Sequence, residues 1–324
     1  MLGSHVLPGN QVRFRFHHNT TASVGVAGNF SGWQPVPLSR QDGGWWGLDI
    51  GPMPAGNLYY KFVTPMGWHT DPHNLRRTHD GQNSLLSVGG GCGHLLQRKF
   101  HTPALGVDKE YVAYFPPEYA TDPDLRLPYL ILMGGLFEGA SGWIDQSSIH
   151  ERLDRLIVSK TIDPMIVVMP DKDDAVFKPK AWDAYFAFLS RDLPGHLEAE
   201  YRTSGIRAAE GLSLGGVWAL RLAALHPERF CSAASLSGQI DGKVCQLFER
   251  NSGRMLECSA RVRLACGDGE GEVVANNAEF AAFVSALGLT CEFRVNHGIH
   301  RWPLWQSQIE DSLKFHDYSF KKAR

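Results

Sequence analysis

A serine framed by glycines is the feature of the sequence most capable of chemistry: Gly211-Leu212-Ser213-Leu214-Gly215-Gly216. The segment before it reads as a short strand, and residues 217–224 favour a helix, which is the strand–turn–helix context that a G-x-S-x-G nucleophile requires. The glycines permit a sharp turn, so the Ser213 hydroxyl lies at a helix N-terminus, where negative charge is stabilised. A serine that only caps a helix is the alternative; the flanking elements favour the nucleophile.

A nucleophilic serine needs a base, and two histidines are candidates. His297 and His300 lie in the segment 296–302, directly after a predicted strand over 291–295. A histidine on a loop after the last strand is well placed to reach the serine. The His-x-x-His spacing could also suggest a metal site, but a third ligand is not identifiable, so no metal is expected.

The acid that orients such a histidine should lie between the serine and the histidine in the chain. The predicted strand over 262–267 ends in Asp268-Gly269-Glu270-Gly271-Glu272, which offers three carboxylates. The acid holds the imidazole in the correct tautomer and stabilises the imidazolium. Spacing alone does not choose among Asp268, Glu270 and Glu272.

An oxyanion hole needs two N–H donors. The residue after the nucleophile supplies the first, here the amide of Leu214. The second should come from a loop that follows an early strand, and Gly135, in Met133-Gly134-Gly135-Leu136, has that position. A plain tight turn is the alternative for this loop.

The elements that must position these residues differ between the two parts of the chain. Residues 10 to 90 contain short strands, such as 12–16, 45–50 and 58–63, separated by turn formers, which predicts a β-sandwich. A glycine-rich linker follows at 89–93. Later apolar runs at 129–133 and 165–169 suit strands buried on both faces. They alternate with amphipathic segments near 143–160, 181–200, 214–226, 273–287 and 303–316. This alternation predicts a mainly parallel sheet covered by helices.

The C-terminal part resembles the putative-esterase family of α/β-hydrolases, which includes enterochelin esterases, S-formylglutathione hydrolases, and feruloyl and acetylxylan esterases. The motifs that carry the resemblance are residues 201–203 with Arg207, the Ser213 motif, His226-Pro227-Glu228-Arg229-Phe230, Ser235-Leu236-Ser237-Gly238 and Gly298-Ile299-His300-Arg301-Trp302-Pro303-Leu304-Trp305. The resemblance implies His300 as the base and Glu270 as the acid. The chain departs from the family at Ile299, where a glycine is usual, and at Met133, where many members have histidine.

The N-terminal part resembles the glycogen-binding modules of carbohydrate-binding family 48. The motifs are Gly28-Asn29-Phe30-Ser31-Gly32-Trp33, Asp42-Gly43-Gly44-Trp45, Tyr60-Lys61-Phe62, Gly67-Trp68-His69-Thr70-Asp71-Pro72 and Gln82-Asn83-Ser84-Leu85-Leu86. The resemblance implies an immunoglobulin-like sandwich whose sugar site comprises Trp33, Lys61, Trp68 and Asn83. Indole faces stack on pyranose rings, and Lys and Asn bond hydroxyl groups. Retained core or interdomain aromatics are the alternative. The expected domains are therefore 1–90 (sandwich), 91–104 (linker) and 105–324 (hydrolase).

Composition limits the partners. The 324 residues carry 32 Lys and Arg against 34 Asp and Glu, a net charge of −2, which provides no strong field for nucleic acid or an anionic membrane. No apolar run approaches the ~20 residues of a membrane helix. The first residues show no secretory signal and the six cysteines are dispersed, so we expect a cytoplasmic protein without a cofactor.

These observations together predict a serine carboxylesterase of the enterochelin esterase type. Its expected partner is a small-molecule or glycan-linked ester, and the N-terminal domain is a candidate polysaccharide binder. Two alternatives remain. One is an acetylxylan or feruloyl esterase that docks on a polysaccharide. The other is an acyltransferase or a catalytically inactive glycan-binding protein.

Overall fold

The structure of the chain is a computed structural model that describes residues 3–19, 22–78, 80–136, 138–172 and 181–323. Two compact units make up the chain. The first contains Met1–Arg98 and Ala113–Leu125, and the second contains Lys99–Val112 and Arg126–Arg324.

Two small antiparallel sheets form the first unit. The first sheet has the order β1 (His5–Leu7), β2 (Gln11–His17), β6 (Trp45–Ile50), β5 (Ser39–Arg40). The second has the order β4 (Val36–Pro37), β3 (Gly25–Gly28), β7 (Gly56–Thr64), β8 (Gly67–His69), and β9 (Ser84–Val88) also pairs with β7. Period-2 alternation turns Phe14 and Phe16 of β2 toward Tyr60 and Phe62 of β7, and the two sheets share this core. The prediction that the N-terminal region is all-β is confirmed: it is β-rich and contains two antiparallel sheets.

The larger sheet of the chain has eight strands in the order β10-β11-β13-β12-β14-β15-β16-β17. Their bounds are β10 (His94–Thr102), β11 (Val107–Phe115), β12 (Leu127–Met133), β13 (Ile166–Pro170), β14 (Thr203–Leu212), β15 (Phe230–Leu236), β16 (Arg261–Gly267) and β17 (Thr290–Asn296). The pairs from β13 to β17 are parallel. Every residue of β12 and β13 is buried, as their continuous apolar runs predict. Because parallel strands end at one edge, the loops after β12, β14, β16 and β17 gather there.

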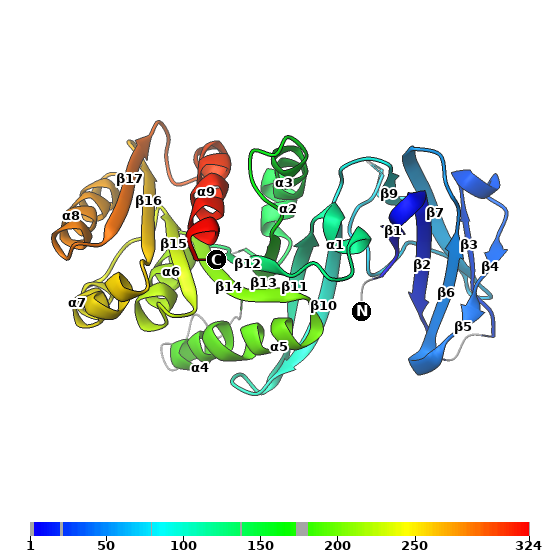
Figure 1. The fold of residues 1–324 in the computed structure, drawn as a ribbon, viewed down its shortest axis with the longest axis horizontal. Helices are drawn as coiled ribbons and strands as arrows, with labels where there is room; N and C mark the ends of the chain where they lie inside the picture. The colour runs from blue at the N-terminus through cyan, green and yellow to red at the C-terminus, as the bar shows by residue number, and fades with distance from the viewer. Residues whose placement is uncertain (1–2, 20–21, 79, 137, 173–180, 324) are drawn as a thin grey trace. The chain divides into compact units, whose positions relative to one another are not determined.

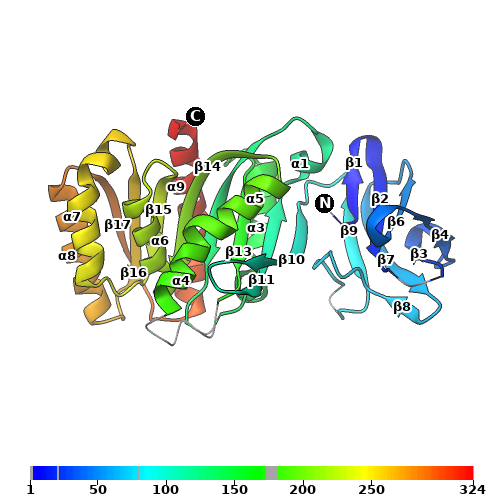
Figure 2. The same ribbon diagram turned by 90° about the horizontal axis from the view of Figure 1, so that it is seen from below.

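Helices cover both faces of this sheet. They are α2 (Gly142–Ser147), α3 (Ile149–Val158), α4 (Trp182–Ala187), α5 (Leu193–Glu200), α6 (Leu214–Leu225), α7 (Gly242–Glu257), α8 (Glu272–Ala286) and α9 (Trp302–Ala323). A further short helix, α1 (Pro117–Thr121), belongs to the first unit and packs against β1. α2, α3 and α9 lie on one face, and α4, α5 and α6 lie on the other (Figures 1 and 2). Among the described residues, no helix is both long enough and apolar enough to cross a bilayer.

The structure differs from the prediction for residues 91–104. These residues were expected to be a linker, but 94–102 form β10, the first strand of the eight-stranded sheet. The glycine run that precedes the strand suggests flexibility, whereas Leu95 and Leu96 are fully buried and hold the strand in place. The structure also contains α7, a helix that lies outside the amphipathic segments identified in the sequence.

Candidate active site

Ser213 occupies a strained turn between β14 and α6. Its backbone has φ 54° and ψ −119°, a conformation that a non-glycine residue adopts only where its surroundings enforce it. The flanking glycines make the turn possible. A Cβ at Gly211 would lie 2.3 Å from the carbonyl carbon of Gly215, and a Cβ at Gly215 would lie 2.6 Å from the carbonyl oxygen of Gly134. The turn leaves Ser213 half-buried at the start of α6. The expected nucleophile geometry is therefore present in the backbone.

The two candidate oxyanion donors lie beside this serine. Leu214 is the first residue of α6, and the first N–H groups of a helix have no partner within it. Gly135 follows β12, and a Cβ there would lie 3.6 Å from the Cβ of Ser213 and 2.6 Å from Cδ1 of Leu212. Both candidate peptides therefore lie next to Ser213.

Glu270 and His300 form a close pair at the ends of β16 and β17. The Nδ1 atom of His300 lies 2.6 Å from Oε1 of Glu270. Because a carboxylate only accepts, Nδ1 carries the proton and Nε2 is left as an acceptor. The Glu270 side chain is 1% exposed, whereas that of His300 is 45% exposed. A buried acid thus orients a histidine that remains accessible, as a general base requires.

Three donors hold Glu270 as a carboxylate. Burial by itself would raise the pKa of Glu270, but hydrogen bonds from His300, the Gly267 N–H and the Ser237 hydroxyl outweigh burial and hold this pKa below its ordinary value. The Ser237 Oγ donates to Oε2 at 2.8 Å. Glu270 is therefore ionised at neutral pH and able to stabilise an imidazolium.

The other candidates occupy different places. Asp268 accepts from Nδ1 of His297 at 3.0 Å and from the Gly298 N–H at 3.0 Å. The His297 side chain is 98% exposed, and that of Asp268 is 54% exposed. Glu272 is exposed and begins α8. Asp268 and His297 thus form an exterior pair, and of these two candidate pairs Glu270–His300 is the one with a buried acid.

The contacts of Ser237 are not predictable from the sequence. This residue follows β15 with φ 56° and accepts a hydrogen bond from Nε1 of Trp305 at 3.0 Å, while it donates to Glu270. The Trp305 ring also meets the His300 ring edge-on at 5.0 Å. Both residues are in motifs that signal the family, but a sequence does not show that they bond to one another.

Ser237 also connects the serine to the acid–histidine pair. Its neighbour Leu236 accepts a hydrogen bond from the Ser213 N–H at 2.7 Å. The end of β15 therefore contacts the Ser213 turn through its backbone and Glu270 through a side chain. Ser213 and His300 both follow strand ends at the same edge of the sheet.

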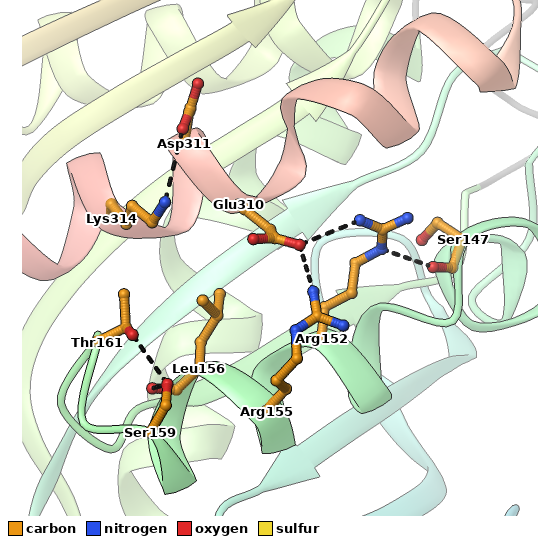
Figure 3. Close-up of polar contacts among 9 residues, drawn as sticks. All are labelled: Ser147, Arg152, Arg155, Leu156, Ser159, Thr161, Glu310, Asp311 and Lys314. Carbon is orange, nitrogen blue, oxygen red and sulfur yellow. Dashed lines mark hydrogen bonds and ion pairs between the residues drawn. The ribbon is translucent and has the colours of Figure 1, made fainter.

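The helix that follows His300 is anchored to α3 by charge. Glu310 of α9 accepts from Arg155 and lies 3.5 Å from Nη1 of Arg152, whose Nε donates to the Ser147 carbonyl at 3.2 Å (Figure 3). These contacts hold α9, which begins at Trp302, two residues after the candidate base.

The described residues of this site contain no cluster of metal-ligating side chains. Within the described ranges, no group of three or more His, Cys, Asp or Glu side chains could hold a metal ion. The candidate residues at this edge of the sheet are of the types that can supply a nucleophile, a base, an acid and two N–H donors.

The candidate sugar-binding residues lie in the first unit. Trp33 and Trp68 are 37% and 49% exposed, and their ring centroids are 6.4 Å apart. Lys61 and Trp68 line one open cleft together with Gln82. Asn83 is the next residue in the chain after Gln82, and its backbone N–H donates to Oγ1 of Thr78 at 3.0 Å. The structure thus brings together three of the four predicted residues, and the fourth follows Gln82.

A comparison with models of known protein families shows which family the chain belongs to. The model of the family described as Putative esterase matches residues 102–316, which is more than half of the sequence. The chain belongs to the Putative esterase family. The predicted resemblance and the α/β-hydrolase fold of the C-terminal part are confirmed.

This esterase-family chain is similar to curated proteins over part of their length. It is similar to an endo-1,4-beta-xylanase/feruloyl esterase of Xylanibacter ruminicola, with 25% identity over 328 residues that cover 92% of this chain and 43% of the relative. It is also similar to the diacylglycerol acyltransferase/mycolyltransferase Ag85A of Mycobacterium gordonae, with 28% identity over 173 residues that cover 38% of this chain and 51% of the relative. The chain therefore spans about half the length of these relatives.

Solved structures share the fold. A ferulic acid esterase superposes with a TM-score of 0.65 at 22% identity and covers 71% of this chain and 100% of its own. The enterobactin esterase FES from Shigella flexneri superposes with a TM-score of 0.57 at 18% identity, and the match covers 94% of this chain and 92% of that one. The second match extends over both units of the esterase-family chain.

Proposed function

We propose that the chain is a serine carboxylesterase in which Ser213 is the nucleophile, His300 the general base and Glu270 the acid. The observation that carries the proposal is the Glu270–His300 pair, with its acid buried and its histidine accessible, at the sheet edge where Ser213 is held at φ 54°. The family membership supports the same reaction class.

In the proposed reaction, Nε2 of His300 takes the hydroxyl proton as Ser213 Oγ attacks the ester carbonyl. The Leu214 and Gly135 N–H groups stabilise the oxyanion, and the tetrahedral intermediate collapses when the imidazolium returns that proton to the departing alcohol. Water then attacks the acyl enzyme, with His300 acting again as base, and releases the acid. Glu270 stays ionised throughout and stabilises the imidazolium.

Two substrate classes fit this site. The first is a soluble ester such as a catecholate trilactone, which the similarity to the enterobactin esterase over both units supports. The second is an acetyl or feruloyl ester on a polysaccharide, which the similarity to the xylanase/feruloyl esterase supports. A hydrolysis screen with both classes and p-nitrophenyl acetate separates them by kcat/KM.

An acyltransferase is a second candidate function, favoured by the similarity to the mycolyltransferase Ag85A. The same acyl enzyme would then give its acyl group to an alcohol rather than to water. Product analysis with an added sugar alcohol separates the two: a hydrolase forms mainly free acid, and a transferase forms mainly the new ester.

Covalent labelling tests the nucleophile directly. A fluorophosphonate should add once to the wild-type chain, as seen by intact mass, and should not add to Ser213→Ala. Ser204→Ala, at an exposed serine of the same strand, is the matched control and should label normally. Labelling of the Ser213→Ala variant at the wild-type rate would refute the proposed nucleophile. A wild-type chain that resists the label but binds glycan would favour the inactive glycan-binding alternative.

We also propose that the first unit binds a polysaccharide through Trp33, Lys61, Trp68 and Asn83. The exposed indole pair and the cleft that contains Lys61 and Trp68 support the proposal. The wild-type chain should be retained on starch or glycogen, and Trp68→Ala should be released. Met66→Ala, at a neighbouring exposed apolar residue, should be retained. Equal retention of Trp68→Ala would reject this site.

A further inference from the structure

A cavity in the first unit is independent of both proposed sites. Its volume is about 180 Å³, and it lies among β1, the turn that follows β1, the segment 86–94 and the start of α1. Every residue that lines it belongs to the same compact unit. Neither the residues of the proposed esterase reaction nor those of the proposed glycan site take part.

His94 is the unusual group in this cavity. The side chain lines the cavity and the residue is only 7% exposed, yet neither Nδ1 nor Nε2 has a hydrogen-bond partner among the described residues. Burial, with the charges of His5, Arg76 and His73, lowers the pKa of His94 to about 3, so the ring is neutral at physiological pH. A neutral imidazole has one N–H donor and one acceptor, and leaving them unpaired in a protein interior is unfavourable. A ligand that accepts a hydrogen bond from the ring N–H would remove part of this penalty.

The remaining lining limits the class of ligand. Leu86, Phe115 and Tyr119 are at most 5% exposed and provide apolar walls. Arg76 brings a positive charge, and its Nε donates to the Gly93 carbonyl at 3.0 Å, which holds the side chain in place. The lining contains no Asp or Glu among the described residues. The cavity is therefore apolar with a polar end that favours an anion.

Size restricts the ligand further. An apolar cavity of roughly 150 Å³ accommodates benzene. A cavity of about 180 Å³ therefore fits one ring, or a branched aliphatic group of similar volume, together with a carboxylate. We propose that this cavity binds a small apolar carboxylate, whose oxygens accept the His94 N–H and lie beside the Arg76 guanidinium.

Benzoate is a suitable probe, and the full-length chain should be titrated with it by calorimetry. The titration should be done on the unlabelled Ser213→Ala variant, whose proposed esterase site is open, and on wild type labelled with the phosphonate, whose proposed esterase site is occupied. Comparing the two samples shows whether any benzoate binds at the proposed esterase site. Saturable binding should be equal in both samples. Benzyl alcohol, which lacks the charge, should bind at least about tenfold more weakly, and benzylammonium should not bind. Absence of saturable benzoate binding, or its loss on phosphonate labelling alone, would overturn the proposal.

Variants locate the binding. His94→Phe keeps a ring of similar size but removes both nitrogens, and should weaken benzoate binding at least about tenfold, since a bond to a charged group is lost. Arg76→Gln should weaken benzoate binding while leaving that of benzyl alcohol unchanged. Ala120→Phe, which fills the cavity from α1 without altering His94, should abolish binding of both. Met66→Ala is the control in the same unit and should bind as the parent does.

Nuclear magnetic resonance of the unsubstituted chain reports on His94 directly, so the result does not depend on whether a variant folds. In the chain labelled with ¹⁵N-histidine, benzoate should shift the ring-nitrogen resonances of His94, and saturation of that shift should follow the calorimetric curve. Unshifted His94 resonances at saturating benzoate, or equal affinity for His94→Phe and the parent, would contradict the assignment.

Discussion

Two networks of serine, histidine and glutamate lie in the hydrolase part of this molecule, and their environments are opposite. At the sheet edge, buried Glu270 holds His300, whose side chain is 45% exposed, near the Ser213 turn. Within the core, the Ser232 hydroxyl donates to Nδ1 of His316 at 2.9 Å, and Nε2 of His316 donates to Glu210 at 3.1 Å. Ser232 and His316 are fully buried, and Glu210 is 2% exposed.

The difference between the two environments shows that catalysis requires more than the right types of residue. The core network has the proton arrangement of a catalytic triad, but its serine lies within strand β15, where no ester can reach it. Its polar groups satisfy one another, which stabilises a buried ionisable pair. The edge network instead leaves Nε2 of His300 as an acceptor and sets Ser213 on a strained turn beside two N–H donors. Accessibility and backbone geometry therefore favour the edge network for the proposed reaction, whereas the core network has the features of a stabilising one.

The largest effect should come from the edge histidine. We expect His300→Ala to lower kcat/KM for p-nitrophenyl acetate by at least about 10³-fold, because the base is lost. His297→Ala is the matched control, since its exposed ring pairs with Asp268 outside this network, and it should retain most of the activity. A greater loss in His297→Ala than in His300→Ala would reassign the base.

The acid of the edge network should rank second. Glu270→Gln keeps the shape of the side chain but removes the charge that stabilises the imidazolium, so we expect kcat to fall by about 10²- to 10⁴-fold with little change in KM. Asp268→Asn is the isosteric control at the neighbouring carboxylate and should change kcat only slightly. Equal losses in the two variants would remove the distinction between the interior and exterior pairs.

The core network should respond in stability rather than in rate. His316→Phe leaves Glu210 buried without its partner, so we expect the free energy of unfolding in urea to fall by about 3–5 kcal/mol. The double variant Glu210→Met/His316→Leu should recover much of this loss. The kcat of the folded fraction should stay close to that of the wild type. A large fall in kcat without loss of stability would show that the core network takes part in the reaction.

The edge network was predictable to a large extent, because its signals are local. The glycines around Ser213 and the histidine after the last strand each follow a strand end, and the family motifs select His300 and Glu270. Spacing alone could not choose Glu270 over Asp268, because the choice depends on which loop carboxylate turns toward the interior.

The core network could not be read from the sequence. Glu210 and His316 are separated by 106 residues, and they meet only because α9 packs against β14 and β15. Strand β10 is also not predicted, for a different reason. The glycines before it suggest a linker, whereas the segment pairs with β11, the next strand along the chain, at the edge of the eight-stranded sheet.

Substitution of the ion pairs that anchor α9 to α3 should have the smallest effect. It tests how the edge network and the core network are connected. α9 carries His316 and follows His300, so its position affects both, and Glu310 joins it to Arg152 and Arg155 (Figure 3). The Arg155 side chain is 59% exposed, and solvent-exposed ion pairs contribute only about 0–1 kcal/mol. We therefore expect Glu310→Gln to lower the free energy of unfolding by no more than about 1 kcal/mol, and less at high salt, because ions screen the pair.

The control is Asp311→Asn, which removes the carboxylate that lies 3.8 Å from Nζ of Lys314. A loss in Glu310→Gln that equals that of His316→Phe would show that the exposed anchor, and not the buried network, determines the position of α9.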